Sequence, residues 1–338
     1  MPLYLITQQK QEVNNHHSKI LNLKTIQFNK SNSIKTMNKY IYQLTVFLYQ
    51  FSPFKKKICD IIKKNKFFSN KLYKDLKFEG AFDVNVSNFE KFKLIHFGGR
   101  IENETYWKGL FTTFEHEMGW LWIFLSKQSD VIIDVGANTG IYSLVAKTVH
   151  PSAKIFAFEP SKNTFHKLIQ NVSLNGFDIQ CYDKALSNNS GTFTFFDSFD
   201  TNQTSASMSD QMHQLWKNYE VNSYEVSTIT GKDFILQAKI EKIDLIKIDV
   251  EMFEPQVIEG FEDVLFNHQP IIFIEVLSNE VAEKLNLLFK NQFAFYHLSD
   301  KEKIVKKNKL EMVPLKWNYV LCPLSKSRVF EKMIENYI

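Results

Sequence analysis

The stretch DVIIDVGANTG, Asp130–Gly140, decides the fold. Val131–Val135 is built from β-branched residues around one aspartate, which predicts a short buried strand. A turn of small residues with two glycines follows at once. Gly136 and Gly140 let the backbone approach a ligand without a Cβ in the way, and Asp134 adds a carboxylate at the strand tip. The sequence therefore predicts a ligand beside this turn.

Strand-like and helix-like segments alternate through the chain after this turn. Buried strands that alternate with helices are typical of a parallel sheet covered by helices on both faces. We therefore expect an α/β fold whose ligands bind at the carboxyl ends of the strands, where the winding reverses. The expected strands are Val131–Val135, Ile155–Phe158, Ile179–Tyr182, Leu245–Val250 and Ile271–Val276, and the expected helices are Ile141–Val149, Ser161–Leu174, Pro255–Leu265 and Glu280–Lys290.

Further segments flank or interrupt that pattern. Phe82–Val86 and Lys93–Phe97 indicate short strands, and the apolar face of Phe111–Ser126 predicts a helix. Between the third and fourth buried strands, Ser187–Lys239 contains the runs GTFTFF and EVSTIT. These runs predict an irregular or partly antiparallel region.

Charge divides the chain into two parts. The first 80 residues hold 15 Lys and no Arg against 4 acidic residues, whereas the remainder holds 26 Lys and Arg against 33 acidic residues. With 338 residues, 44% of them hydrophobic, the chain is long enough for one large domain plus an extension. We expect a disordered tail over 1–36, a basic helical extension over 37–80, an α/β domain over 81–325 and a C-terminal tail over 326–338.

Composition argues against several classes of protein. The acidic body has no basic stripe and no recognised binding motif, which argues against nucleic-acid binding. Three scattered cysteines are too few for a disulfide framework or a zinc site. They fit a reducing compartment, so the expected location is the cytoplasm.

The basic extension favours two different partners. Tyr40–Phe51 is an apolar run of 12 residues, whereas a membrane-spanning helix needs about 20. Lysines then alternate with isoleucines and phenylalanines between Lys55 and Phe68, which predicts a basic amphipathic helix. Such a helix could lie on the anionic inner face of a membrane. Alternatively, it could pack on its own body or on another subunit of a homo-oligomer.

The turn after the first strand also selects among cofactors. Its glycines are spaced G-x-x-x-G, whereas a dinucleotide pyrophosphate is bound by G-x-G-x-x-G. The carboxylate of Asp134 would repel a pyrophosphate and attract a sulfonium that carries an ammonium group. These features favour S-adenosylmethionine. If Gly136 lies against this cofactor, Gly136→Val should abolish cofactor binding and leave the fold largely intact.

Two more acids follow the next two strands. Glu159 comes 25 residues after Asp134, where an acidic side chain can accept hydrogen bonds from both ribose hydroxyls. It could instead stabilise the start of the helix near Ser161 through its charge. Asp183 follows the third strand and could bind the adenine amino group, or it could be a solvated loop residue.

Five blocks occur together and in order: DVGANTG, AFEP, KALS, DLIKIDVEMFEPQVIEG and PIIFIEV. In this combination the chain resembles the FkbM family of S-adenosylmethionine-dependent methyltransferases, over roughly Phe111–Pro323. The resemblance implies a class I methyltransferase fold, which is Rossmann-like, and O-methylation of a hydroxyl on a sugar, glycan or polyketide-like acceptor. The pair Met252-Phe253 departs from the family, which commonly has Gly-Ala there. We expect this bulk to reshape the opening for the acceptor.

The resemblance also implies particular cofactor contacts. Glu115, which precedes the first strand, is implied as one of them. Together with the residues argued above, the expected cofactor-binding set is Glu115, Asp134, Gly136, Ala137, Asn138, Gly140, Glu159, Pro160, Asp183, Ala185 and Asp249.

The block KIDVE brings two carboxylates to the same edge of the sheet. If Leu245–Val250 is a strand, alternation puts Asp249 and Glu251 on one face at its tip. Buried carboxylates are costly unless they bind something. Methyl transfer needs an aligned acceptor oxygen and a base for its proton, so Asp249 or Glu251 is the expected base. Alternatively, the two could orient loops or hold Lys247.

Two other residues extend this chemistry. Glu275 ends the following strand, and with Asp249 it could hold a divalent ion through oxygen ligands, although the spacing reveals no third ligand. His116, between Glu115 and Glu117, is another candidate base.

The resulting hypothesis is an O-methyltransferase that uses S-adenosylmethionine. One alternative is a non-catalytic module of the same fold in a membrane-associated glycan assembly complex, and another is an NAD-dependent reductase. The intact set of Asp134, Gly136, Gly140 and Glu159 favours the enzyme, because a module without cofactor would not need it.

Overall fold

The computed structural model describes residues 46–65, 72–112, 115–198, 206–208, 221–289, 291–299 and 303–335. The chain divides into two compact units, with the boundary between Lys77 and Phe78. The tail expected over 1–36 lies outside the described residues.

The first unit contains the helices α2 (Lys55–Lys64) and α3 (Leu72–Asp75). Tyr49 and Cys59 are buried in it. The Tyr49 hydroxyl donates to the backbone carbonyl of Lys77 at 2.8 Å and lies 3.0 Å from the Cys59 sulfur. Within the described part of the chain, every helix is too short or too polar to cross a membrane.

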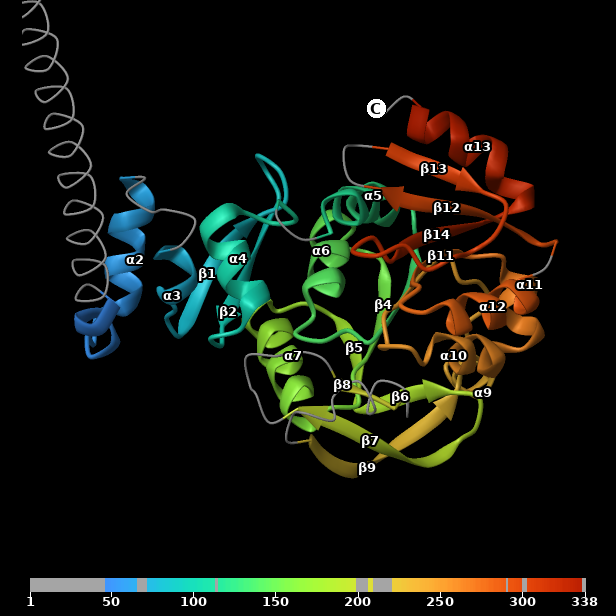
Figure 1. Ribbon diagram of the computed structural model, residues 1–338, viewed down its shortest axis with the longest axis horizontal. Coiled ribbons are helices and arrows are strands. Elements are labelled where there is room, and N and C mark those ends of the chain that lie inside the picture. Colours follow the sequence, from blue (N-terminus) through green and yellow to red (C-terminus); the bar gives the residue numbers. More distant parts are fainter. Residues whose placement is uncertain are drawn as a thin grey trace, which may run out of the picture. The chain divides into compact units, whose positions relative to one another are not determined.

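The second unit is built around a mainly parallel sheet (Figure 1). In the described residues it has eight strands in the order β13-β12-β14-β11-β10-β3-β4-β5. Starting at β3, the chain adds β4 and then β5 on one side of that strand. It then returns to the other side of β3 and adds β10 and β11 there, so the direction in which strands are added reverses between β3 and β10. The strands are β3 (Val131–Val135), β4 (Lys154–Phe158), β5 (Ile179–Tyr182), β10 (Leu245–Ile248), β11 (Ile271–Glu275), β12 (Phe293–Ser299), β13 (Lys303–Lys307) and β14 (Asn318–Pro323).

The five parallel strands confirm the expected α/β fold. Three further strands extend the sheet beyond β11: β14 and β13 run antiparallel to β11, whereas β12 between them runs in the same direction as β11. This strand order, with an antiparallel strand inserted next to β11, is that of a class I methyltransferase. Residues 326–338, expected as a tail, include most of helix α13 (Leu324–Glu335), which buries Phe330 and Ile334.

The helices that flank the sheet mostly match the expected ones. They are α5 (His116–Ser126), α6 (Ile141–Val149), α7 (Lys162–Asn175), α9 (Gly231–Gln237), α10 (Glu254–Phe261), α11 (Asp263–His268) and α12 (Asn279–Leu288). The helix expected over Phe111–Ser126 begins only at His116, because Phe111 and Glu115 have φ of 52° and 49°. The helix expected over Pro255–Leu265 is two helices, separated at Glu262 with φ of 50°.

Helices cover both faces of the sheet (Figure 1). On one face, the ring of Trp122 in α5 contacts Tyr142 in α6 and Phe273 in β11. On the other face, Phe234 in α9 contacts Phe158 in β4. The register of the parallel strands places Phe273 and Phe158 on opposite faces. The sheet is therefore buried from both sides, as its near-continuous apolar strands predict.

Two smaller sheets complete the unit. β1 (Gly80–Asn85) and β2 (Lys91–His96) form an antiparallel pair where two short strands were expected. In the region expected to be partly antiparallel, β7 (Gly191–Ser198) pairs antiparallel with β9 (Val221–Thr230). β6 (Lys184–Ser187) pairs parallel with β9, and β8 (Ala206–Ser207) pairs with β7.

Candidate functional site

The candidate site lies at the carboxyl ends of β3, β10 and β11, where the winding reverses. Lys247 in β10 pairs with Asp134 in β3 on one side and with Phe273 in β11 on the other. Paired residues share a face, so Asp134 and Lys247 lie side by side on the face covered by α5 and α6. Glu275, two residues after Phe273, shares that face.

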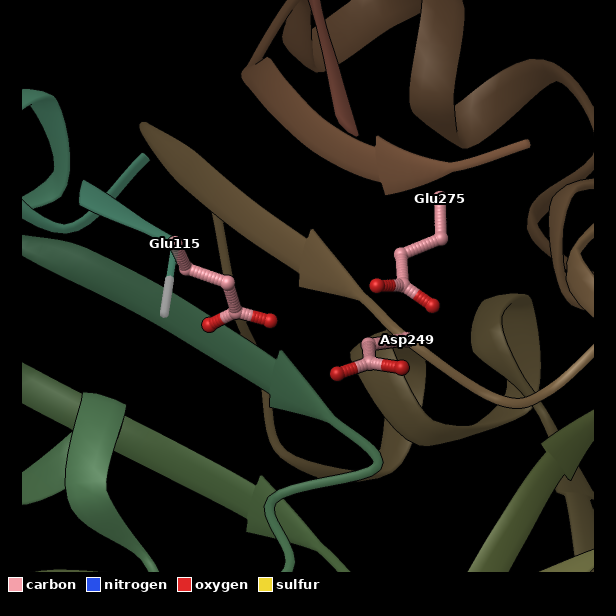
Figure 2. A group of neighbouring side chains, drawn as sticks. All are labelled: Glu115, Asp249 and Glu275. Carbon is pink, nitrogen blue, oxygen red and sulfur yellow. The ribbon is translucent and has the colours of Figure 1, made fainter. Parts of the chain in front are cut away.

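Three carboxylates meet at this edge (Figure 2). One oxygen each of Glu115, Asp249 and Glu275 lies within 4.8 Å of the others. Glu115 comes from the turn before α5, Asp249 follows β10, and Glu275 is the last residue of β11. The sequence predicted Asp249 and Glu275 as a pair and Glu115 as a separate cofactor contact. The structure brings all three together.

Two neighbouring side chains hold the cluster in place. The ammonium of Lys247 donates to Asp249 Oδ2 at 2.8 Å. The hydroxyl of Tyr142 donates to Glu115 Oε2. Lys247 Nζ also lies 4.8 Å from the centre of the Tyr142 ring, a cation–π contact. Lys247 and Tyr142 therefore fix the positions of two carboxylates from two different parts of the chain.

The electrostatics of the cluster are dominated by burial and by like charge. Burial, and then the nearby Asp249 and Glu115, raise the pKa of Glu275 well above its ordinary value. Burial and Asp249 also raise the pKa of Glu115. Burial alone would lower the pKa of Lys247, but the surrounding carboxylates raise it, so its ammonium stays charged at neutral pH.

Asp134 is placed differently from the expectation. It lies within β3 and has no exposed surface, so it does not touch a ligand directly in this conformation. Its Oδ2 accepts a hydrogen bond from Ser143 Oγ at 2.6 Å, whereas Oδ1 has no partner among the described residues. Burial raises its pKa. Ser143 thus ties Asp134 to the start of α6, and a role of this carboxylate in cofactor binding stays a prediction.

Gly136 is required by the backbone itself. Its φ is 77°, and a Cβ there would lie 1.9 Å from the backbone carbonyl oxygen of Asp249. The amides of Gly136 and Ala137 both donate to the carbonyl of Phe158, at 3.0 and 2.9 Å. The turn is thus pressed between β4 and the segment after β10. The expectation that Gly136→Val would leave the fold intact is wrong, because the added side chain meets backbone.

Glu159 fixes the other side of the turn. Its Oε2 accepts from the backbone amide of Asn138 at 2.9 Å, and its Oε1 accepts from that of Ser161 at 2.9 Å. The predicted link to the start of the helix near Ser161 is therefore present. A carboxylate oxygen accepts more than one hydrogen bond, so these contacts are compatible with ribose hydroxyls at the same oxygens.

The segment after β10 corrects another expectation. β10 ends at Ile248, and Glu251 has φ of 54°, so strand alternation does not put Asp249 and Glu251 on one face. The fully buried Glu254 holds this segment, because its Oε1 accepts from the amides of Val250 at 3.3 Å and Met252 at 3.2 Å. Burial raises the pKa of Glu254 to about 8.

The bulky pair after IDVE packs inward. Met252 and Phe253 are both buried, and Phe253 contacts the ring of Phe193 in β7. In the structure their side chains therefore fill the interior between α10 and the sheet that contains β7. The expected effect on the acceptor opening would have to be indirect.

The remaining predicted residues lie around the cluster. His116 is exposed, and its Nδ1 lies 3.9 Å from Glu117 Oε1. It lines a cavity together with Glu115 and Asn318. Asp183 is exposed after β5, Ala185 is buried in β6, and Pro160, Ala137 and Gly140 flank the turn.

Three residues of the site escaped the sequence analysis: Tyr142, Ser143 and Asn318. Tyr142 and Ser143 occupy the first turn of α6, directly after the glycine turn. Polar residues in the first turn of an otherwise apolar helix were the signal that could have revealed them. Asn318 belongs to a strand that the sequence analysis did not identify.

Comparisons with known proteins give the chain its context. Residues 134–300 match the model of the Methyltransferase FkbM domain. Hexuronic acid methyltransferase AglP of Haloferax volcanii is 27% identical over 140 residues, which cover 41% of this chain and 53% of that protein. 31-O-demethyl-FK506 methyltransferase FkbM of Streptomyces tacrolimicus is 28% identical over 161 residues, 40% of this chain and 61% of that protein. 2-O-methyltransferase NoeI of Sinorhizobium fredii is 27% identical over 169 residues, 47% of this chain and 68% of that protein.

The chain thus spans between about half and two thirds of the length of these curated relatives. The similarity covers the sheet from β3 to β12, and with it the turn and two of the three carboxylates. Glu115 and the first unit lie before the matched domain.

Proposed function

Because the chain belongs to the FkbM family of methyltransferases through residues 134–300, we propose that it is a cytoplasmic, S-adenosylmethionine-dependent O-methyltransferase. The observation that carries the proposal is the position of the carboxylate cluster. Glu115, Asp249 and Glu275 lie where the winding of the sheet reverses, and Asp249 touches the glycine turn through its backbone.

The residues around the turn fit a sulfonium cofactor. The carboxylates of Glu115, Asp249 and Glu275 gather acidic groups at the edge of the sheet, which favours a cation. Glu159, at the end of the next strand, offers acceptor oxygens to ribose hydroxyls. A pyrophosphate would meet the carboxylate cluster instead, which is unfavourable. This arrangement supports S-adenosylmethionine over a nicotinamide dinucleotide.

S-adenosylmethionine supplies a methyl group on a sulfonium, which an acceptor oxygen attacks in line; an O–C bond forms, the C–S bond breaks, and its electron pair stays on sulfur. The chain's own task is to align the acceptor and to remove its hydroxyl proton. Asp249 is suited to take that proton, because Lys247 fixes its carboxylate and its side chain is 26% exposed. Glu251 and His116 are the alternative bases.

The names of the relatives support an acceptor that bears hydroxyls. AglP is named for hexuronic acid, NoeI for a 2-O position and FkbM for the 31-O position of FK506. We therefore propose a hydroxyl of a sugar, glycan or polyketide-like molecule as the acceptor. A non-catalytic module of the same fold would not need the cofactor, so calorimetry with S-adenosylmethionine separates it from the enzyme.

Glu159→Ala should weaken S-adenosylmethionine binding by about 1–3 kcal/mol, which is roughly 5- to 150-fold, because charge-assisted hydrogen bonds to the ribose are lost. Isothermal titration calorimetry with the purified full-length protein measures it. The matched control is Asp178→Ala, an exposed acid directly before β5, at the opposite end of the parallel strands. A melting curve separates lost binding from lost folding. Binding of NADH in place of S-adenosylmethionine would favour the reductase.

The first unit favours a contact with an anionic membrane surface. Four apolar side chains are largely exposed there: Phe47, Leu48, Phe51 and Phe54. The lysines of α2 begin at the next residue, Lys55. Exposed aromatic residues beside a basic helix are typical of segments that lie in a membrane interface. We propose that this unit binds the inner face of a membrane.

Replacing Lys55, Lys56 and Lys57 by Gln should reduce binding to anionic vesicles by about 3 kcal/mol, since each lysine near such a surface contributes about 1 kcal/mol. Sedimentation with phosphatidylserine vesicles at low salt measures the effect. The control replaces Lys154, Lys162 and Lys332, which are exposed elsewhere. Equal sedimentation of the two triple variants would contradict the membrane proposal and favour packing against protein.

A further inference from the structure

We infer that the cluster of Glu115, Asp249 and Glu275 binds a divalent cation, Mg²⁺ or Mn²⁺, which contacts the acceptor hydroxyl. The inference rests on the proposed function, because the role of the ion is to orient the oxygen that receives the methyl group. Binding of the ion itself can be measured without cofactor or acceptor.

The spacing of the oxygens fits one ion. The three carboxylate oxygens lie within 4.8 Å of one another. Ligands on opposite sides of an ion lie about 4.2 Å apart for Mg²⁺ and about 4.8 Å apart for Ca²⁺, given their usual metal–oxygen distances. Only a small inward movement of the side chains is needed for Mg²⁺ or Mn²⁺. The donor set is all oxygen, which these hard cations prefer.

Glu275 lacks the partner that its burial requires. It is 9% exposed and makes no hydrogen bond or ion pair with any residue in the described ranges. Glu115 and Asp249, by contrast, accept from Tyr142 and Lys247. Figure 2 shows the carboxylate of Glu275 directed toward Asp249. A buried carboxylate without a hydrogen bond or an ion pair is unfavourable, so this side chain points to a missing cation.

A further oxygen comes from the neighbouring strand. Asn318 in β14 pairs with Glu275 across the sheet, so their side chains share a face. Its Oδ1 is buried and has no hydrogen-bond partner among the residues that the structure describes. Asn318 also lines a cavity with Glu115. An amide oxygen is a common ligand of hard divalent cations, and here it is independent of the carboxylates.

Charge balance favours a divalent ion. The cluster brings three carboxylates together beside a single ammonium, that of Lys247, and a divalent cation bound to them stabilises their ionised forms. Lys247 donates a hydrogen bond to Asp249, and Tyr142 donates one to Glu115. Metal ligands commonly have such hydrogen-bonding partners, which fix their orientation. The ammonium of Lys247 forms its ion pair with Asp249.

A bound ion restricts which chemical groups on an acceptor bind well at this site. A cation with open coordination positions binds two adjacent oxygens more firmly than one, which favours a sugar with neighbouring hydroxyls or a hydroxyl beside a carboxylate. It also makes the bound hydroxyl more acidic, so that a base removes its proton more readily. The methyl transfer itself is unchanged.

The test is a titration of the full-length protein with MnCl₂ after treatment with EDTA and dialysis, in the absence of S-adenosylmethionine. Calorimetry, with electron paramagnetic resonance of unbound Mn²⁺, should show one site, and Mg²⁺ should compete for it. Glu275→Gln should weaken Mn²⁺ binding at least about 10-fold, since loss of one ligand removes both charge and a bond. Glu280→Gln, in the exposed pair with Lys284 on α12, is the matched control and should bind as the wild type does.

Three results would overturn the inference: no Mn²⁺ site in the wild type, equal affinity in Glu275→Gln, or equal loss in Glu280→Gln. Because the Gln variant removes a buried charge, it should fold, and a melting curve verifies this. Calorimetry with S-adenosylmethionine separates the two claims. Normal cofactor binding without Mn²⁺ binding rejects the ion and keeps the proposed function, whereas Mn²⁺ binding without cofactor binding rejects the function.

Discussion

Asp249→Asn is expected to lower methyl transfer by about 10²–10⁴-fold and to leave the affinity for S-adenosylmethionine unchanged, because a general base acts only in the transition state. Asparagine keeps the shape of the side chain but cannot accept the hydroxyl proton. Transfer of labelled methyl from S-adenosylmethionine to a panel of uronic-acid and hexose glycans measures the rate, and calorimetry measures the affinity.

The surroundings of Asp249 make this a sensitive position. The ammonium of Lys247 lies 2.8 Å from its carboxylate, and Glu115 and Glu275 lie on its other side. Asp178→Asn, which changes an exposed acid in the same way, should keep full activity and serves as the control. Near-full turnover of Asp249→Asn on an acceptor that the wild type methylates would contradict the role. The search for the base would then move to Glu251 and His116.

The parallel half of the fold was predictable because its signals are local. Val131–Val135 and Ile179–Tyr182 are strands with the predicted bounds, and Ile141–Val149 is a helix with the predicted bounds. Each is an apolar segment bounded by turn residues, so its own composition identifies it. A strand buried on both faces needs no partner to be recognised in the sequence.

The rest of the fold depends on contacts between distant segments. β14 enters the sheet between β11 and β12, although β12 precedes it in the chain. No local pattern indicates which edge a strand joins or in which direction. The late start of α5 is similar, since it follows from the left-handed conformation of Phe111 and Glu115. Such conformations are set by packing and are rarely visible in side-chain type.

In the candidate site, too, some residues could be predicted from local sequence, whereas others depend on contacts between distant segments. Asp249 and Glu275 could be paired from sequence, because each lies near the carboxyl end of a predicted strand and the two strands follow one another in the chain. Glu115 lies 134 residues before Asp249, and only the packing of α5 on α6 brings it to the same edge. The predicted orientation of Glu251 was wrong for a local reason. Strand alternation was extended past the end of β10, where the backbone turns into a left-handed conformation.

Gly136→Ala is expected to destabilise the protein by more than about 4 kcal/mol, or to prevent folding, since two separate costs add. The backbone has φ of 77°, which costs a non-glycine residue about 1–2 kcal/mol. In addition, the new Cβ would lie 1.9 Å from the carbonyl oxygen of Asp249, and a backbone atom cannot turn aside as a side chain can.

Gly176→Ala provides a matched comparison for that substitution, because it separates the cost of conformation from the cost of the clash. Gly176 ends α7 with φ of 62° and has nothing within 4 Å of the position of a Cβ. Its substitution should cost only about 1 kcal/mol. Urea or thermal unfolding of both variants measures the difference. Gly136→Ala could instead melt at the same temperature as the wild type and lose only S-adenosylmethionine binding. In that case the glycine would be needed for the ligand alone, and the close contact described between the turn and Asp249 would be wrong.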